Sequence, residues 1–563
     1  MKRNTILSAI TGAALLLLTA ACSNDENNNE PQKEPTQAVQ FSFTAEDFGE
    51  DETPTRASVE ATPQIVDLGD CEAEITVENE PAAKKTRGAQ TPANGHYTIR
   101  AYQAGVLKGQ MKGTFSGGTF TPDGGTADKM LLPHGTYDFV AFNDDVTALG
   151  NDLTVARSKA ETAMMGFANG ENINQNPKQQ VYFVMKRVGA RLRTQFVCQK
   201  HIPNNITATL EGAAANAIPM SVAYNPGTKA YTATNGTMAP ESNNSPASTE
   251  EKYRGSNYGY DYAYTSTSTN YHYFLPTTEA SNLKLSFSAG TIFWNPITAA
   301  QKLNINLSMQ SGKSYLVKFK LKPQYTYLMS DGTTGYFKDT AFGGAPAATA
   351  KTPIALVLDK VQGIGIALRN ANVSSQFMVN AYRTSPSPQY NTNTTPTVSD
   401  ALTGPDVSGY NETWNASYST AAVPSNKVKG ENSGFLSFWS AAHYNPGVTY
   451  TGTPAAKWFL PSASDWKLFY SFGFGDDYPI KKRGIDYKWY GRLIESAIRQ
   501  VGGYSSLFES YWASTETTDD GDDTSSSGYG QVVVVVGYDD MMWAGWADNR
   551  GLSGPTRAFV KFK

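Results

Sequence analysis

The sequence predicts a mostly β protein with several domains, and three observations support this prediction. The chain has 563 residues, too many for one hydrophobic core, so we expect three or four domains. Only 17% of the residues are charged, whereas Tyr, Thr, Asn, Ser and Gly are plentiful, as in sheets and turns. Short segments of alternating apolar and polar residues recur along the first 322 residues.

Charge and cysteine content exclude several classes of protein. The net charge is −4 without a basic tract, so we expect no nucleic-acid partner. The histidines are scattered and no His/Cys pair has the spacing of metal ligands, so we predict no metal site and no cofactor. We expect Cys71 and Cys198 in separate β-structures; the sequence leaves open whether they are two buried thiols or one disulfide.

Residues 1–22 are predicted to be a lipoprotein signal peptide. A positive start, Met1-Lys2-Arg3, precedes an apolar stretch that is too short to span a bilayer. The segment Leu18-Thr19-Ala20-Ala21-Cys22 resembles a bacterial lipobox, although Thr19 replaces the commoner Leu, and the resemblance implies lipidation of Cys22. The alternative is a plain secretory signal with a chance cysteine.

Residues 23–37 are polar, acidic and Pro-containing, so we expect a disordered tether. Several acyl chains on Cys22 would hold the protein on the outer membrane, since each buried methylene contributes about 0.8 kcal/mol. An acidic run directly after the lipid cysteine resembles the surface-export signals of outer-membrane lipoproteins. A solvated linker without an export role is the alternative.

Residues 38–180 and 181–322 are each predicted to form a β-sandwich. In the first, Val39 to Thr44 and His96 to Tyr102 alternate as strands do, and a turn at His134 leads into a strand with Tyr137 and Phe139 on one face. The strands expected in the second are Val181–Val188, Leu192–Val197, Ile206–Leu210, Tyr271–Leu275, Leu283–Phe287, Leu303–Leu307 and Tyr315–Leu321.

Three segments of this region carry a resemblance. LLPHGTYDFVAF (131–142), VYFVMKRVGARLRTQF (181–196) and SGKSYLVKFKLK (311–322), together with the leader, resemble fimbrillin-like proteins, the subunits of type V pili. The resemblance covers about residues 38–322 and implies two transthyretin-like sandwiches. It also implies donor-strand assembly: a protease cleaves after an arginine, the first strand leaves, and a strand of another pilin subunit takes its place.

Arg56 and Ala57 are the candidate processing site. They follow a polar, acidic, turn-prone run, which is an accessible place for a trypsin-like protease. Removing Val39 to Thr44 would bare a sheet edge that captures another strand. The alternative is that Arg56 is an ordinary loop arginine and the lipid anchor is permanent.

Residues 323–563 differ in composition and are predicted to form a separate head. Eight of the nine tryptophans follow Pro323 and no cysteine does. A helix should begin after Ser462, with Asp465 completing a capping box, and a second should run from 489 to 501 and end at Gly502. We expect buried strands at 353–358 and 365–368, an exposed loop over 384–412, and strands at 531–536, 541–546 and 557–562.

The order of the head resembles a C-type-lectin-like fold. WFLPSASDW (458–466), helices, YWASTE (511–516) and a closing RAFVKF (557–562) are similar to the module of fibrobacter-type paralogous surface domains. We place Trp458, Trp466 and Trp512 in the core. Stacking and hydrogen-bonding groups that suit a glycan gather near the C-terminus. These candidate ligand-binding residues are Asp539, Asp540, Trp543, Trp546, Asp548, Asn549 and Arg550.

The head lacks the residues of an enzyme. It has no cysteine and its only histidine is His443, so we predict no catalytic residues; the Asp519–Asp523 run is read as solvated. The function that we predict is a surface tip or accessory pilin that mediates adhesion to glycans or proteins. The alternative is a monomeric, glycan-binding lipoprotein of the outer membrane. The segment from Thr556 to Lys563 should be a strand within the head, not a detached donor tail.

Overall fold

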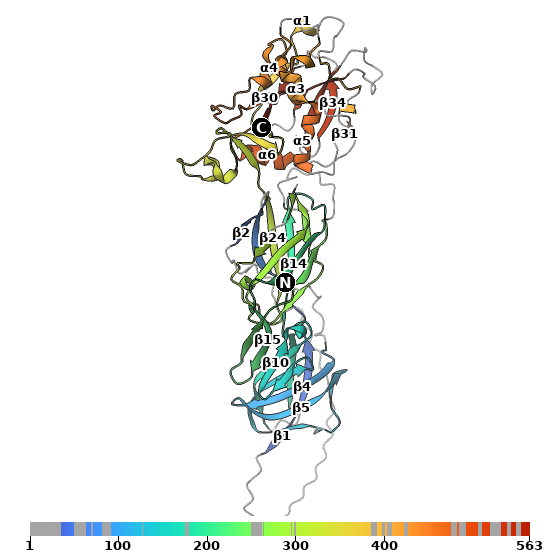
Figure 1. The fold of residues 1–563 in the computed structure, drawn as a ribbon. Coiled ribbons are helices and arrows are strands. Elements are labelled where there is room, and N and C mark those ends of the chain that lie inside the picture. The colour runs from blue at the N-terminus through green and yellow to red at the C-terminus, as the bar shows by residue number, and fades with distance from the viewer. Residues whose placement is uncertain are drawn as a thin grey trace, which may run out of the picture.

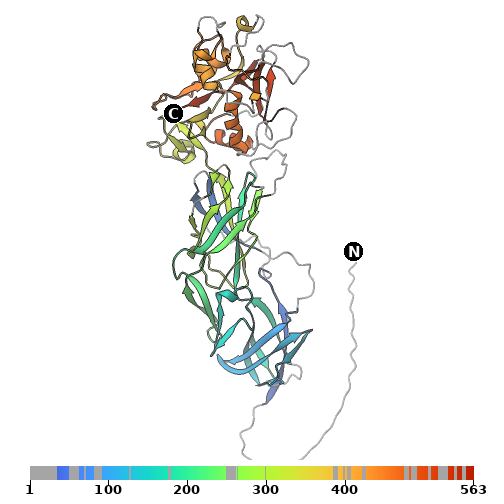
Figure 2. The same cartoon turned by 45° about the vertical axis from the view of Figure 1, so that its right-hand side comes forward.

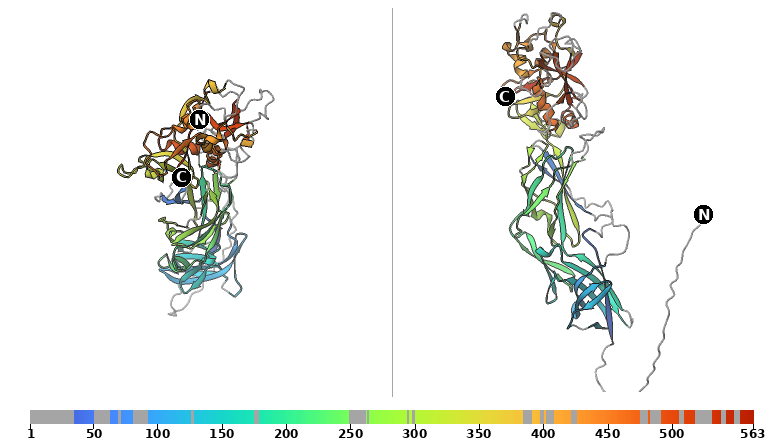
Figure 3. Two further views of the ribbon diagram at one scale, coloured as in Figure 1. Left: turned by 45° about the horizontal axis from the view of Figure 1, so that its top comes forward. Right: turned by 90° about the vertical axis from the view of Figure 1, so that its right-hand side faces the viewer.

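The computed structural model describes residues 35–49, 63–68, 71–80, 92–125, 128–174, 179–248, 262, 264–293, 295–297, 300–383, 391–396, 400–401, 408–420, 426–474, 481–482, 491–504, 509–517, 531–537, 542–547 and 553–563. These residues form a column of three stacked parts, with the head at one end (Figure 1). Figures 2 and 3 show the same order from other sides. The prediction of a mostly β fold is confirmed.

The part farthest from the head, the first β unit, is built on one eight-stranded sheet. Its strand order is β6-β5-β4-β8-β11-β12-β1-β7. Tyr137, Phe139 and Ala141 point into its core, as their alternation predicted. The bounds are β1 Thr36–Ala45, β4 Gly95–Gln103, β5 Val106–Ser116, β6 Thr119–Pro122, β7 Met130–Pro133, β8 Gly135–Asn143, β11 Met164–Ile173 and β12 Gln180–Arg187.

The middle part, the second β unit, has two main sheets. The six-stranded sheet contains β18-β13-β24-β3-β2 with β19 beside β13, and the four-stranded sheet has the order β17-β14-β20-β23; β21 and β22 form a small ribbon. The bounds are β2 Gln64–Asp67, β3 Cys71–Asn79, β13 Ala190–Cys198, β14 Ile206–Gly212, β17 Glu241–Ser245, β18 Tyr264–Thr267, β19 His272–Phe274, β20 Leu283–Ala289, β21 Thr291–Ile292, β22 Asn295–Pro296, β23 Ala300–Lys302 and β24 Ser314–Pro323.

A further sheet joins the two β units. Strands β9 (Thr147–Leu149) and β10 (Asp152–Ala156) continue into β15 (Ile218–Asn225) and β16 (Ala230–Gly236). We call these four strands the bridging sheet. Val155 of β10 and Val222 of β15 face each other and are almost fully buried in one apolar cluster. The chain therefore passes to the second unit and back at β2–β3, passes to it again after β12, and leaves it once more for the bridging sheet at β15–β16.

Three expectations for this region are wrong. Val181–Val188, expected in the second sandwich, supplies β12 of the first β unit, which lies between β11 and β1. The segment Leu303 to Leu307 is buried at Leu303 and Ile305 but forms no strand, because the N–H groups of Ile305 and Leu307 bond to carbonyls two residues back. Cys71 and Cys198 lie in one sheet, not in separate structures, on the two strands beside β24. Because β24 lies between them, these two strands are about 10 Å apart, which is twice the spacing of neighbouring strands. The cysteines form no disulfide, which needs Cα atoms within about 7 Å.

The head combines sheets with helices. One six-stranded sheet has the order β26-β25-β27-β28-β36-β30, a four-stranded sheet has the order β31-β34-β33-β32, and β29 pairs with β35. The strand bounds are β25 Thr326–Met329, β26 Thr334–Tyr336, β27 Pro353–Asp359, β28 Ile364–Ala367, β29 Asn372–Gln376, β30 Lys457–Phe459, β31 Lys481–Lys482, β32 Ser510–Thr517, β33 Gln531–Gly537, β34 Met542–Ala547, β35 Ser553–Thr556 and β36 Phe559–Lys561. The helices are α1 Asn380–Arg383, α3 Gly409–Trp414, α4 Leu436–Ala442, α5 Ala463–Phe474 and α6 Gly491–Arg499.

Both predicted helices of the head are confirmed. Ser462 Oγ accepts from Asp465 N at 3.0 Å while Asp465 Oδ2 accepts from Ser462 N at 2.8 Å, which is the capping box at the start of α5. Helix α6 buries Leu493, Ile494, Ala497 and Ile498 and is followed by Gly502 at a φ of 74°.

The expectation of an exposed loop over 384–412 is wrong for part of its described residues: Thr392, Asn393 and Pro396 are exposed, but others are not. Asn391 and Thr395 are buried, and Glu412 of α3 is completely inaccessible to solvent. They pack against β32: Asn391 N and Thr395 N bond to the side chain and the backbone carbonyl of Glu516, respectively. Some of the polar residues in the described part of this segment thus belong to a buried hydrogen-bond network.

Candidate functional site

The first candidate site is the position of β1 in the first β unit. β1 runs parallel to β12, from Gln40 opposite Gln180 to Ala45 opposite Met185, and antiparallel to the short β7, from Thr36 opposite Pro133 to Val39 opposite Met130. We call this position between β12 and β7 the β1 site. It lies at the end of the column that faces away from the head (Figure 1).

The inward face of β1 is built from three large apolar side chains. Val39, Phe41 and Phe43 are 5%, 5% and 1% exposed, as the alternation of this segment predicted. Phe43 stacks on Tyr97 with centroids 4.8 Å apart and an interplanar angle of 9°. Phe41 contacts Phe139 edge-on at 6.3 Å. The core of the first β unit is therefore closed by side chains of its first strand.

After β1 the chain turns toward the second β unit. Glu46 pairs with Lys186 at 3.0 Å, and Gly49 N donates to Gly312 O at 2.8 Å. Phe48 is buried, and its ring lies 5.8 Å from that of Tyr273. Arg56 and Ala57, which follow, lie outside the described residues, as does Cys22.

The C-terminal strand is an integral part of the head. β36 lies between β28 and β30, with Val560 opposite both Gly365 and Trp458. Ala558, Phe559 and Val560 are completely buried. Thr556 to Lys563 is thus held as the sequence predicted, and it could not leave the head without opening its main sheet.

The predicted glycan-binding residues are not placed by the structure. Asp539, Asp540, Asp548, Asn549 and Arg550 lie outside the described residues. Trp543 and Trp546 belong to β34, whose described backbone pairs with β33 at Val536 and Val533. The predicted core residues Trp458, Trp466 and Trp512 are 8%, 1% and 2% exposed, so their assignment to the core is confirmed.

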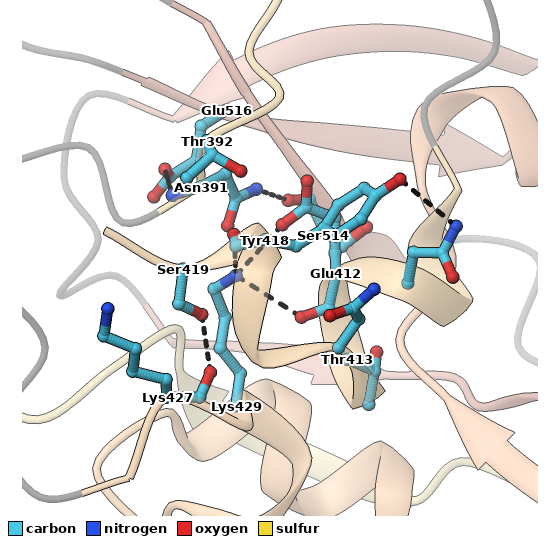
Figure 4. A network of polar contacts seen from close by, with 12 residues as sticks. Asn391, Thr392, Glu412, Thr413, Tyr418, Ser419, Lys427, Lys429, Ser514 and Glu516 are labelled. Atoms are coloured by element: carbon cyan, nitrogen blue, oxygen red, sulfur yellow. Dashed lines mark hydrogen bonds and ion pairs between the residues drawn. The ribbon is translucent and has the colours of Figure 1, made fainter. Parts of the chain in front are cut away.

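Sequence reasoning missed a buried polar network in the head (Figure 4). Lys429 Nζ donates to Glu412 Oε2 at 2.9 Å and to Tyr418 O at 2.9 Å, and neither charged side chain has any exposed surface. Asn391 N donates to Glu516 Oε2 at 2.8 Å, and Asn391 Nδ2 donates to Ser514 O. We call Glu412, Lys429 and Glu516, all fully buried, the buried triad.

Burial changes the protonation of two members of this triad. Desolvation raises the pKa of Glu412 to about 7, against the opposing charge of Lys429. Desolvation likewise lowers the pKa of Lys429, although Glu412 opposes this shift. Both shifts favour the neutral forms. The only sequence signal for these groups was a Glu between two aromatic residues, Tyr410 and Trp414.

Two general searches of the described residues gave negative results. No cluster of three or more His, Cys, Asp or Glu side chains with the geometry of a metal site occurs among them. None of the helices in the described ranges combines the length and apolarity required to cross a bilayer.

Comparison with known proteins gives structural neighbours from Bacteroides. No protein-family model matches the chain, and no curated protein matches it. A fimbrial protein from Bacteroides ovatus is 10% identical at a TM-score of 0.23, with 94% of this chain and 100% of that chain covered. A fimbrial protein from Bacteroides vulgatus is 12% identical at a TM-score of 0.26, with 40% of this chain and 91% of that chain covered. A candidate cell adhesion protein from Bacteroides uniformis is 16% identical at 0.26, covering 41% and 92%. At these TM-scores the likeness establishes neither fold nor function.

Proposed function

We propose that this chain is a fimbrillin-like surface lipoprotein, a tip or accessory pilin that is assembled by donor-strand exchange and mediates adhesion through its head. The proposed fold is two transthyretin-like sandwiches below a C-type-lectin-like head, anchored at Cys22 in the outer membrane. No catalytic role is part of the proposal.

The observation that carries the proposal is the β1 site. In the sequence, β2 and β3 lie between β1 and the other strands of the first β unit, and these two strands belong to the second β unit. Loss of β1 would remove Val39, Phe41 and Phe43 from the core and uncover the side chains that they cover; each of the three contributes about 1.5–3 kcal/mol when buried. A strand with large apolar residues at alternate positions would restore both the hydrogen-bond ladder and this core.

The fold favours Arg56 over Arg87 as the processing position. Cleavage after Arg56 would release β1 and leave β2 and β3 in place. Cleavage after Arg87 would also remove β3, which pairs with β24 over nine residues and buries Ala73 and Ile75 completely. Only cleavage between β1 and β2 opens the β1 site without dismantling the second β unit.

The structure of the head supports a position at the tip of a fibre. The strand from Thr556 to Lys563 is locked between β28 and β30, so this segment is not free to act as a donor. A subunit that accepts a strand at one end and presents a head at the other suits the tip of a fibre. The alternative is a monomeric glycan-binding lipoprotein, which would keep β1 and the lipid anchor.

Mass spectrometry of the N-terminus of the protein isolated from its native surface tests the proposal. We expect a start at Ala57, and we expect Arg56→Ala to block processing whereas the matched variant Arg87→Ala does not. A mature protein that starts at a diacylated Cys22 and retains residues 23–56 would contradict strand exchange and favour the alternative. Glycan arrays with the full chain would then test the head.

A further inference from the structure

We propose that the side chains of Glu412 and Lys429 join in an intramolecular amide bond, a covalent clasp inside the head. The two groups meet without solvent: Nζ lies 2.9 Å from Oε2, and both side chains are 0% exposed. Glu412 lies on α3, and Lys429 begins the 3₁₀ turn Lys429–Glu431. The bond would close a loop of the chain that includes the segment outside the described residues.

The surroundings of Lys429 suit a nucleophile. Nζ donates to two backbone carbonyls, Tyr418 O at 2.9 Å and Glu412 O at 3.3 Å. A neutral amine has two N–H groups and one lone pair. When the two carbonyls take the N–H groups, the lone pair is left for the third neighbour, the carboxyl group of Glu412. Phe438, whose ring centroid lies 5.4 Å from Nζ, helps to keep water away.

The surroundings of Glu412 suit the acceptor of the attack. Burial favours the neutral carboxylic acid, whose carbon is far more electrophilic than that of a carboxylate. Glu516, the second carboxyl group of the buried triad, acts electrostatically on both partners: its charge raises the pKa of Glu412 and that of Lys429. It accepts a hydrogen bond from Asn391 N and is itself completely buried.

The reaction balances without any further reagent. The Nζ lone pair forms a bond to Cδ of the protonated Glu412, and the Cδ–OH bond breaks. One proton passes from the nitrogen to the departing hydroxyl group, which leaves as water. One carboxylic acid and one amine become one amide and one water, and nothing is oxidised or reduced.

Two features of the site favour the product. Groups held in reactive contact can reach effective molarities of about 10⁵ M or more, because their translational freedom is already lost. The amide also removes two charges from a site where desolvation opposes them. Among the described residues, Glu412 Oε1 has no hydrogen-bond partner, and an amide has one oxygen fewer to satisfy.

Peptide mapping of the folded full-length chain tests the clasp directly. Trypsin cannot cleave after an acylated lysine, so the linked protein should give a branched product. In it, residues 384–427 are joined to residues 428–457, and its mass is lower than that of the two peptides by one water. Fragmentation should place the branch at Glu412 and Lys429.

Controls make the outcome decisive. Lys429→Arg keeps the charge but cannot form the amide, so the branched peptide should disappear. Glu412→Ala removes the carboxyl group that would acylate Nζ, so the branched peptide should disappear in this variant too, and circular dichroism shows whether each variant is folded. Recovery of unlinked 384–427 and 430–457 peptides at full yield from the wild-type protein would overturn the proposal, as would a branch at any other pair.

Discussion

Phe43 contacts aromatic rings from four strands: Tyr97 of β4, Phe115 of β5, Phe120 of β6 and Phe183 of β12, at centroid distances of 4.8 to 5.9 Å. Aromatic pairs at such distances add stability beyond their buried area. One side chain of β1 therefore touches most of the sheet that β1 completes.

Truncation of Phe43 measures how much this side chain contributes to stability. We expect Phe43→Ala to lower the free energy of unfolding of the first β unit by about 3–5 kcal/mol, because the ring is 1% exposed and leaves a cavity. Gln40→Ala on the exposed face of the same strand should change it by less than about 0.5 kcal/mol. Urea unfolding followed by tyrosine fluorescence checks both. Equal effects of the two variants would mean that β1 does not close the core.

His96 gives the first β unit a dependence on pH. Its ring bonds Asp144 at 2.8 Å and Asp123 at 3.0 Å, and these bonds raise the pKa of His96 in the folded state. The stabilisation is fully present below the unfolded value of about 6.5 and is lost as pH rises through the raised folded value. It is small, below about 1 kcal/mol, because all three groups are partly exposed.

The variant His96→Gln isolates this effect. We expect the wild-type protein to be more stable relative to the variant at pH 5.5 than at pH 8.5, since only the wild-type ring carries a charge between the two aspartates at the lower pH. Urea midpoints of both proteins at the two values give the difference. An unchanged difference between the proteins at both values would show that the ring contributes no charge-dependent stability.

At the level of elements, a strand can be predicted from the sequence when one of its faces is apolar and the other polar. A strand whose two faces have the same polarity is missed. β1, β12 and β24 bury alternate apolar residues, so their burial could be predicted from the alternation. β16, with the sequence AYTATNG, is exposed on both faces along most of its length and carries no such contrast. It is held in place by pairing with β15, to which the short turn between Asn225 and Ala230 joins it.

Of the two candidate sites, one could be predicted from the sequence and the other could not. The β1 site was predictable because Val39, Phe41 and Phe43 form a pattern of period two. The buried triad was not, because Glu and Lys are almost always exposed and only their pairing across the fold allows full burial. Sheet membership of β3 also depends on a partner 240 residues away, as the contact between Glu78 and Lys318 illustrates.

Exchange at the β1 site can be tested with peptides. After cleavage at Arg56, we expect a synthetic peptide of residues 36–45 to bind the processed chain and to restore its stability. The same peptide with Phe41→Asp should fail, because the charge would enter the core, whereas the matched Gln40→Asp peptide should bind nearly as well. Calorimetric titration measures all three. Equal binding of the two altered peptides would argue against insertion in this register.

For the whole molecule, the bridging sheet makes the two β units depend on each other. Val222 of β15 is 1% exposed in a cluster that also contains Val140 and Leu153 of the first unit. A second apolar cluster runs from the second β unit into the head: it includes Phe319 and Trp466, and Tyr325 lies 5.8 Å from Phe472. The described parts of the column are thus linked by shared cores.

This continuity predicts cooperative unfolding. We expect one main calorimetric transition for the β units of the wild-type chain and two for Val222→Asp, which places an unpaired charge in the shared cluster at a cost of about 3–5 kcal/mol. Thr232→Asp on the exposed β16 should leave the single transition intact. Two transitions in the wild-type protein would show that the bridging sheet does not couple the units.

The geometry of the β1 site has a mechanical meaning. A strand at this site is bonded along both edges, over six residue pairs to β12 and four to β7. Tension applied along such a strand loads these bonds in shear, so they must break together instead of peeling away one by one. A fibre joined through this site would therefore resist the drag of flowing liquid by the length of its ladders, even though each individual hydrogen bond is weak.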